Sequence, residues 1–271
     1  MRRILLLVVL ALCSTMLFAD GDHSVAGARF AGMAGSSAVF HDTWSVFGNQ
    51  AGLAGLHTTS LGISYENRFL MKETGYGAFA FQTPVAFGNL GIGYSHFGYS
   101  EYNENKFALA WAQQLFKRIA MGVQADYFMI HQPGLYGNLH AFSFEIGIMV
   151  QASERLRFGA HVSNPWPIQI IGVQGQYLPA VLKAGMGYSF NKNLIVTVEA
   201  EKNLHLEKPV FRAGVEYQSD RHYSLRLGIA NQPVLFAVGF GYKFNAFHID
   251  MGYGYHQVLG SSPVITLNYV F

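Results

Sequence analysis

The sequence is poor in charge and has a single cysteine. Charged residues make up 13% of the 271 positions, about half of the roughly 25% found in soluble domains, so the chain offers little surface to water. Aromatic residues reach 15%, which excludes a disordered chain. Cys13 lies in a segment that we expect to be removed, so disulfides and thiolate chemistry are excluded from the mature chain.

No apolar run in the sequence is long enough for a transmembrane helix. The strongest stretch, residues 227–242, carries no charge, but Pro233 interrupts it. A spanning helix needs about 20 apolar residues without such a break. If the chain crosses a membrane, it must do so with strands.

Residues 1–19 have the pattern of a secretory signal peptide. Arg2 and Arg3 precede an apolar run from Ile4 to Leu12, and Ala19 is the small residue at the cleavage site. The alternative is a lipoprotein signal ending at Cys13, but such a signal needs a small residue where this sequence has Leu12. Without residues 1–19, 16 basic residues balance 16 acidic ones, so the charge gives no reason to expect nucleic acid as a partner.

Apolar and polar residues alternate from about residue 60 to the C-terminus. Phe142, Phe144, Ile146 and Ile148, for example, are separated by polar residues and glycine. Because successive side chains of a strand point to opposite faces, each such segment predicts a strand with one apolar face and one polar or glycine face.

A membrane barrel explains this alternation better than its alternative, a soluble sandwich or barrel. The polar faces hold glycine with few lysines or glutamates, and aromatic residues gather near strand ends, as at membrane interfaces. The last strand ends in Tyr269 and Phe271, which resembles the insertion signal of outer-membrane proteins. We therefore expect an all-β fold, a transmembrane antiparallel β-barrel over residues 60–271, with outer-membrane lipid and the barrel-assembly machinery as partners.

The connections between strands support a count of about 14. Short turns alternate with longer or proline-bearing loops, as in single-chain bacterial barrels. An even number places both termini on the periplasmic side of the outer membrane of a Gram-negative bacterium. The predicted strands are 60–69, 74–83, 88–98, 104–113, 119–130, 140–150, 155–163, 180–190, 194–203, 210–218, 223–230, 234–244, 247–256 and 263–271.

The lumen of such a barrel is too wide to be filled by the side chains of its strands. Eight strands already accommodate ordinary side chains, so fourteen leave a lumen that is either plugged or conducting. Residues 20–59 precede the first strand and are small and rich in glycine, which lets the backbone fold tightly. They predict a short N-terminal plug, or hatch, inside the lumen.

Two motifs in this segment resemble those of the FadL-like outer-membrane barrels. Residues 27–35 read G-A-R-F-A-G-M-A-G and residues 49–54 read N-Q-A-G-L-A. The family pattern is A-R-x-x-G-M-G-G, an acidic spacer and N-P-A-G-L, so Gln50 stands where proline is usual. The matching residues, which form the plug motif, are Arg29, Gly32, Met33, Gly35, Asp42, Asn49, Ala51, Gly52 and Leu53.

The C-terminal half resembles one branch of these proteins, the PorV/PorQ group. The similar segments are residues 178–185, L-P-A-V-L-K-A-G, and residues 239–271. This resemblance implies a non-enzymatic accessory of type IX protein secretion or surface assembly, with secretion-system components or cargo as partners. The alternative that FadL-like proteins imply is passive transport of a hydrophobic ligand through a hatch-gated barrel.

Polar side chains on the inward faces of the predicted strands are a candidate lumen cluster. They could form a proton-sensitive gate. The simpler interpretation is that these charges pair with one another and with the plug backbone, because buried charges require partners. The residues are Glu145, Arg157, His161, Arg212, Glu216, Arg226, His248, Asp250 and His256.

We expect no metal, cofactor or catalytic site. The 11 histidines show no His-Cys cluster and no H-E-x-x-H spacing. Ser163 and His161 share a strand face, which makes the catalytic pair of a barrel phospholipase conceivable, but no third residue can be placed beside them. Trp166, between two prolines in the longest loop, is either an interfacial anchor or a contact for a ligand or partner.

Overall fold

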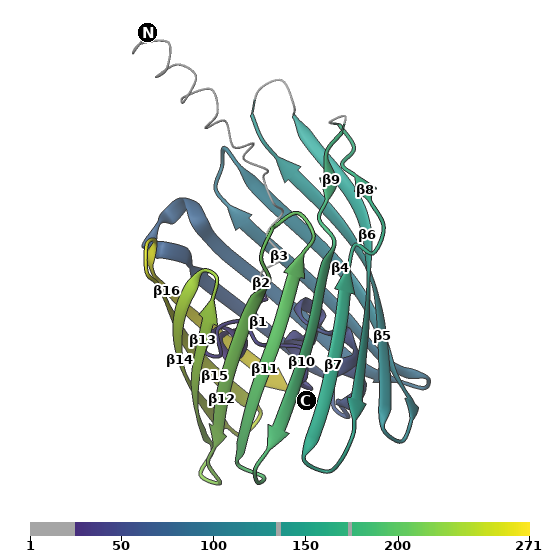
Figure 1. The fold of residues 1–271 in the computed structure, drawn as a ribbon, viewed down its shortest axis with the longest axis vertical. Helices are drawn as coiled ribbons and strands as arrows, with labels where there is room; N and C mark the ends of the chain where they lie inside the picture. Colours follow the sequence, from purple (N-terminus) through teal and green to yellow (C-terminus); the bar gives the residue numbers. More distant parts are fainter. Residues whose placement is uncertain (1–24, 134–136, 173–174) are drawn as a thin grey trace.

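The chain forms a closed barrel of antiparallel strands around its own N-terminal segment (Figure 1). The computed structural model describes residues 25–133, 137–172 and 175–271. The predicted signal peptide, residues 1–19, and the first five residues of the predicted plug lie outside the described residues.

Fourteen strands make up the barrel wall, and each pairs with its neighbours in antiparallel register. The predicted fold class and strand number are confirmed. The strands are β1 (Ser60–Asn67), β2 (Gly75–Val85), β3 (Gly88–Gly98), β4 (Asn103–Phe116), β5 (Ile119–His131), β6 (Asn138–Gln151), β7 (Leu156–Ser163), β10 (Val181–Ser189), β11 (Leu194–Asn203), β12 (Val210–Gln218), β13 (Tyr223–Asn231), β14 (Val234–Phe244), β15 (Phe247–His256) and β16 (Gly260–Val270).

The ring closes between the first and last strands. In the β1–β16 pair, Leu61 lies opposite Tyr269 and Ile63 lies opposite Leu267. Next to this seam, the backbone N–H of Phe271 donates to the carbonyl of Thr59 at 2.9 Å. Residue 59 and the C-terminus therefore lie at the same end of the barrel.

The two ends of the barrel differ in their connections. One end, called here the short-turn end, carries tight turns such as residues 117–118 and 245–246, together with the C-terminus. The other, the long-loop end, carries residues 68–74, 132–133, 164–172 and 175–180. Among the wall strands in Figure 1, β5 and β6 rise furthest at the long-loop end.

The loop between β7 and β10 contains a small hairpin that the alternation does not predict. Its strands are β8 (Ile168–Gln169) and β9 (Tyr177–Leu178). Ile170 and Leu178 are buried against Leu139 and Ala141 of β6. An apolar surface therefore lines one side of the lumen at the long-loop end.

The outward and inward faces of the wall follow the predicted alternation. Outward positions hold large exposed apolar side chains, such as Phe142 and Ile148 of β6 and Leu227 of β13. Inward positions hold glycine, alanine and buried polar residues, and the most deeply buried large side chains belong to the N-terminal segment, including Trp44 and Phe30. The core of the molecule therefore lies in the lumen.

Candidate functional site in the barrel lumen

Residues 25–59, named here the lumenal segment, lie within the ring of strands (purple in Figure 1). The segment contains the one-turn helix α2 (Ala28–Ala31) and two 3-10 helices, η1 (Thr43–Phe47) and η2 (Gln50–Gly55). Its caps come from the plug motif. The Asp42 carboxylate accepts the backbone N–H of Trp44 at 3.0 Å, and the Asn49 side-chain oxygen accepts that of Ala51 at 3.1 Å.

Glycines on the barrel wall and in the lumenal segment let the two backbones approach closely. A Cβ atom added to Gly32 would lie 2.9 Å from the Cα of Gly239 on β14. One added to Gly228 on β13 would lie 2.3 Å from the carbonyl carbon of Met33. Since real Cβ atoms do not come this close, the inward glycines are needed to admit the segment.

The remaining motif residues are buried where the lumenal segment packs against the barrel wall and against itself. Asn49 donates from its amide to the carbonyl of Ala38 at 2.7 Å and to that of Ile148 at 3.1 Å. Gly52 has no room for a side chain beside the carbonyl of Phe40. The other motif residues are placed as follows: Ala51 and Leu53 are fully buried, and Gly35 has a positive φ beside Arg212.

A chain of ion pairs joins α2 to the strands β12, β13 and β15. The guanidinium of Arg29 binds both carboxylate oxygens of Glu216, at 2.8 and 2.6 Å, and that of Asp42 at 2.7 Å. Arg226 then bridges Glu216 and Asp250, each at 2.6 Å. Burial opposes the charge of Arg29, but the two carboxylates outweigh it and raise its pKa above the ordinary value. Arg29 therefore stays charged.

A second charged group surrounds η2. Glu145 of β6 accepts from Lys106 at 2.7 Å, contacts His161 at 2.9 Å and accepts from the side-chain amide of Gln50. Lys106 also lies 3.3 Å from Asp126. Gln50, which stands where the FadL-like pattern has proline, therefore donates a hydrogen bond to Glu145 on the barrel wall.

A third charged group holds the backbone between the two ends of the segment. One oxygen of Glu199 accepts the N–H groups of Ser37 and Ala38 at 2.9 and 2.8 Å. Beside it, Glu201 pairs with Arg212 at 3.1 Å and with Lys183 at 3.3 Å.

The structure distributes the nine predicted lumen residues over these groups and leaves three of them apart. Arg157 donates to the carbonyl of Val39 at 2.8 Å. His248 lies at the short-turn end, whereas His256 lies at the long-loop end, where its ring nitrogen accepts the backbone N–H groups of Val258 and Leu259. The nine residues do not form one cluster.

Several partners in these groups are missing from the sequence-based set. Lys106, Asp126, Lys183, Glu199 and Glu201 all occupy inward positions of strands. The same alternation could have predicted their positions, because a charged residue that alternates with large apolar ones lies on the inward face. The separation of the groups around the wall depends on register and has no signal in a single sequence.

The geometry gives no support to a catalytic pair at Ser163. The Nε2 atom of His161 contacts Glu145 and Gln50, and its Nδ1 has no hydrogen-bond partner among the described residues. Trp166 is 64% exposed and packs on Phe144 with ring centroids 5.5 Å apart. Within the described parts of the chain, no group of three or more acidic, histidine or cysteine residues could hold a metal ion.

Two cavities lie on opposite sides of the lumenal segment. The one at the long-loop end has a volume of about 540 Å³ and is bounded by Val25, Ala31 and Ala34 of the segment. The one at the short-turn end has about 290 Å³ and is bounded by Arg29 and His41. The segment therefore lies between two openings of the lumen.

The larger cavity is mostly apolar and its charges are paired. Its apolar walls include Phe69, Phe97, Leu206, Val210, Leu235 and Val264. Of the cations that line it, Arg68 lies 3.2 Å from Glu66, and Arg212 pairs with Glu201. Arg68 also lies over the rings of Tyr76 and Phe97, at 4.5 and 5.3 Å. The cavity therefore combines an apolar wall with balanced charge.

His41 is the histidine of the lumenal segment that faces the smaller cavity. Its Nδ1 lies 2.8 Å from the carbonyl of Gly52. Burial lowers the pKa of His41 to about 4, and the positive charge of Arg157 adds to the effect. At neutral pH the ring is therefore uncharged and donates to that carbonyl.

Several solved structures share this architecture. The toluene transporter TbuX of Ralstonia pickettii superimposes with a TM-score of 0.70 at 13% identity, over 92% of this chain and 99% of that chain. The monoaromatic hydrocarbon channel CymD gives 0.66 at 13% identity, over 93% and 98%. A FadL homologue of Pseudomonas aeruginosa gives 0.60 at 12% identity, over 91% and 98%.

What these proteins share with the chain is the fold. No protein-family model matches the sequence, and no curated protein matches it. No helix of the described residues has the length and apolar character to cross a membrane.

Proposed function

We propose that this protein is an outer-membrane channel for small, uncharged hydrophobic compounds, closed at rest by its lumenal segment. The observation that carries the proposal is the apolar cavity of about 540 Å³ at the long-loop end, which ends on Val25, Ala31 and Ala34 of that segment. The shared fold with two hydrocarbon transporters supports it.

The charges of the cavity favour an uncharged compound over a fatty acid. Arg68 and Arg212 are the cations that could hold a carboxylate there, and each already has a carboxylate partner within 3.2 Å. An anion there would have to share an arginine whose charge a carboxylate already balances. A neutral aromatic or aliphatic compound needs only the apolar wall.

The outer-membrane location follows from the outward face of the barrel. Large apolar side chains cover that face, and a closed barrel is one of the two folds that satisfy every backbone hydrogen bond in lipid. In this proposal residues 1–19 direct export from the cytoplasm of a Gram-negative bacterium. The short-turn end, with the C-terminus, faces the periplasm, as in bacterial barrels.

Tyr269 and Phe271 keep their proposed role as the signal read by the barrel-assembly machinery. Their ring centroids lie 4.8 Å apart, and Phe271 is 66% exposed beyond the end of β16. The secretion accessory role that the PorV/PorQ motifs predict rests on those motifs alone and stays a prediction. Full export of type IX cargo after deletion of the gene would exclude it.

The transport proposal is tested with two dyes of matched shape. Cells that express the barrel are expected to take up neutral N-phenyl-1-naphthylamine faster than cells without it, and to exclude anionic 8-anilinonaphthalene-1-sulfonate. Ala230→Trp fills the cavity and should abolish the gain, whereas Ala125→Trp, on the outward face of β5, should preserve it. Equal entry of both dyes, or no effect of expression, contradicts the proposal.

A further inference from the structure

The outward face of the barrel carries a single charged side chain. Among the outward positions of the fourteen described wall strands, Lys202 of β11 is the only residue that is charged at neutral pH. Every other strand carboxylate, lysine and arginine occupies an inward position. A cation on the lipid face of a barrel is destabilising unless it lies near the interface or finds an anion.

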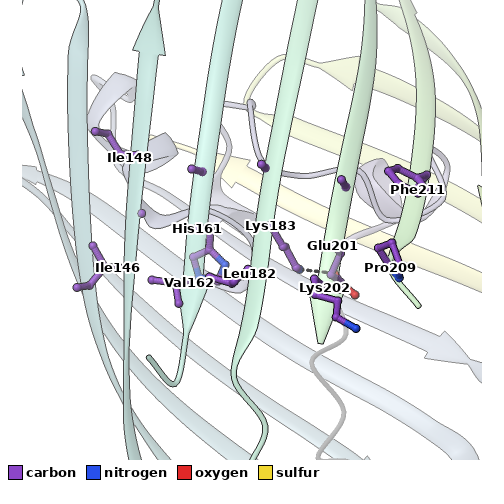
Figure 2. Close-up of a pocket in the computed structure, with 14 residues that line it drawn as sticks. Ile146, Ile148, His161, Val162, Leu182, Lys183, Glu201, Lys202, Pro209 and Phe211 are labelled. Carbon is purple, nitrogen blue, oxygen red and sulfur yellow. Dashed lines mark ion pairs between the residues drawn. The ribbon is translucent and has the colours of Figure 1, made fainter. Parts of the chain in front are cut away.

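Lys202 lies at the edge of a groove in the outer surface (Figure 2). The groove crosses β6, β7, β10, β11 and β12 and encloses about 550 Å³. A second depression of about 660 Å³ continues it toward β13 and shares Ala184, Ala200 and Phe211 with it. A lipid-facing surface is therefore hollowed here over several strands.

The register explains why the surface is hollow. Ala160, Ala184 and Ala200 lie directly opposite one another on β7, β10 and β11, and the row ends at Ile148 on one side and Phe211 on the other. The next row toward the long-loop end holds the larger side chains of Val162, Leu182 and Lys202. The outcome is an apolar trough with raised walls.

Polar groups border this trough at the long-loop end. The ammonium of Lys202 donates to the carbonyls of Leu206 and Glu207 in the loop above it, the latter at 2.9 Å, so it is held at the level of the loop. Asn231 lines the second depression and uses its side-chain oxygen to accept the N–H of Phe211 at 2.8 Å. Asn231 is exposed at this edge of the depression.

We propose that the groove binds one acyl chain of an anionic membrane lipid, whose phosphate contacts Lys202. The apolar trough fits the chain, and the single outward cation, at the membrane-interface level, fits the phosphate. A second copy of the protein would bring another Lys202, or an apolar surface, to the same place and would leave the charge without a partner. The inference depends on membrane exposure of the wall and is independent of what passes through the lumen.

The test measures lipids that stay bound to the purified protein. The barrel is purified in a neutral maltoside detergent, titrated with phosphatidylglycerol or phosphatidylcholine of identical chains, and analysed by native mass spectrometry. We expect one phosphatidylglycerol per barrel. Lys202→Gln should reduce its affinity about fivefold, the contribution of one lysine near an anionic surface, without affecting phosphatidylcholine.

Three further variants separate the outcomes. Ala184→Leu fills the trough and should remove the bound lipid of either kind, whereas Lys202→Arg should retain it. Lys192→Gln removes an 80% exposed lysine at the short-turn end and serves as the matched control. Unchanged phosphatidylglycerol binding in both Lys202→Gln and Ala184→Leu overturns the proposal, and so does a dimer that disappears in Ala184→Leu. Heat-modifiable migration on gels verifies that each variant is folded, and dye uptake tests the channel separately.

Discussion

The guanidinium of Arg29 binds the carboxylate of Glu216 at two points, with its Nε and Nη2 atoms 2.8 and 2.6 Å from the two oxygens. This two-point contact joins the first helix of the lumenal segment to β12. Both groups have further partners, Asp42 for the arginine and Arg226 for the glutamate. The segment is therefore fixed to the wall by a network whose bonded pairs are separated by 10 to 187 positions in the sequence.

Replacing Arg29 by glutamine should loosen the lumenal segment. Removing one partner of a buried ion pair costs about 3–5 kcal/mol, and because Glu216 retains Arg226 we expect about 2–3 kcal/mol. The reporter is Trp44, which is 1% exposed, in a background with Trp111 and Trp166 changed to phenylalanine. Its emission should shift to the red at lower urea concentration than in the parent.

The control is an exposed pair. Lys192 and Asp220 lie 3.5 Å apart with exposed side chains, so Lys192→Gln should change the urea midpoint little. Arg29→Gln combined with Glu216→Gln should recover part of the loss, since amides can replace the contact. An unchanged midpoint in Arg29→Gln would show that the network does not hold the segment.

A methyl group at Gly228 should displace the lumenal segment. A Cβ there would lie 2.3 Å from the carbonyl carbon of Met33 and 2.4 Å from the amide nitrogen of Ala34, and overpacking of this kind costs about 1–3 kcal/mol. Gly254→Ala is the matched control, because its nearest atom, on Leu235, is 3.4 Å away. In planar bilayers, Gly228→Ala should conduct ions more often than Gly254→Ala. Equal conductance would contradict the close contact.

The lumenal segment should lose stability as the pH falls from about 6.5 to 4. In the folded chain the pKa of His41 is about 4, whereas an unfolded histidine titrates near 6.5. The unfolded form therefore binds a proton first, so the stability is complete above pH 6.5 and decreases by up to about 3 kcal/mol toward pH 4. The Trp44 urea midpoint measured at several pH values should decrease accordingly.

His41→Gln is the variant for this test. Glutamine can still donate to the carbonyl of Gly52 but does not titrate in this range. The slope of the midpoint against pH should flatten between pH 6.5 and 4. If the slope persists, another group is responsible.

Placing proline at position 50, as in the FadL-like pattern, should be tolerated. Gln50 is the first residue of η2, where proline fits, and Asn49 before it has the extended φ and ψ of −117° and 108° that proline requires of its neighbour. Gln50→Pro loses the hydrogen bond to Glu145 and should cost about 1 kcal/mol. Asn49→Ala, which loses three hydrogen bonds, one of them the cap of η2, should cost about 2–3 kcal/mol. The reverse order in urea unfolding would contradict the assigned roles.

The sequence predicts the wall of the barrel better than its contents. Alternation such as that of Phe142 to Ile148 fixes which side chains face outward, so strand number and most strand limits could be predicted. The pairing of Arg29 with Glu216 could not, because it depends on which strands stand opposite one another across the ring. Nor could the β8–β9 hairpin, since two-residue strands carry no period. The inward glycines were visible, but their partners in the lumenal segment were not.

The closed ring also imposes an order on folding. A segment that fits against Gly228 and Gly239 at backbone contact cannot thread into a finished barrel past its own charged network. We therefore expect the segment to be in place before β1 and β16 pair, next to the hydrogen bond between Thr59 and Phe271. Pairing of β1 with β16 would then close the barrel around the lumenal segment.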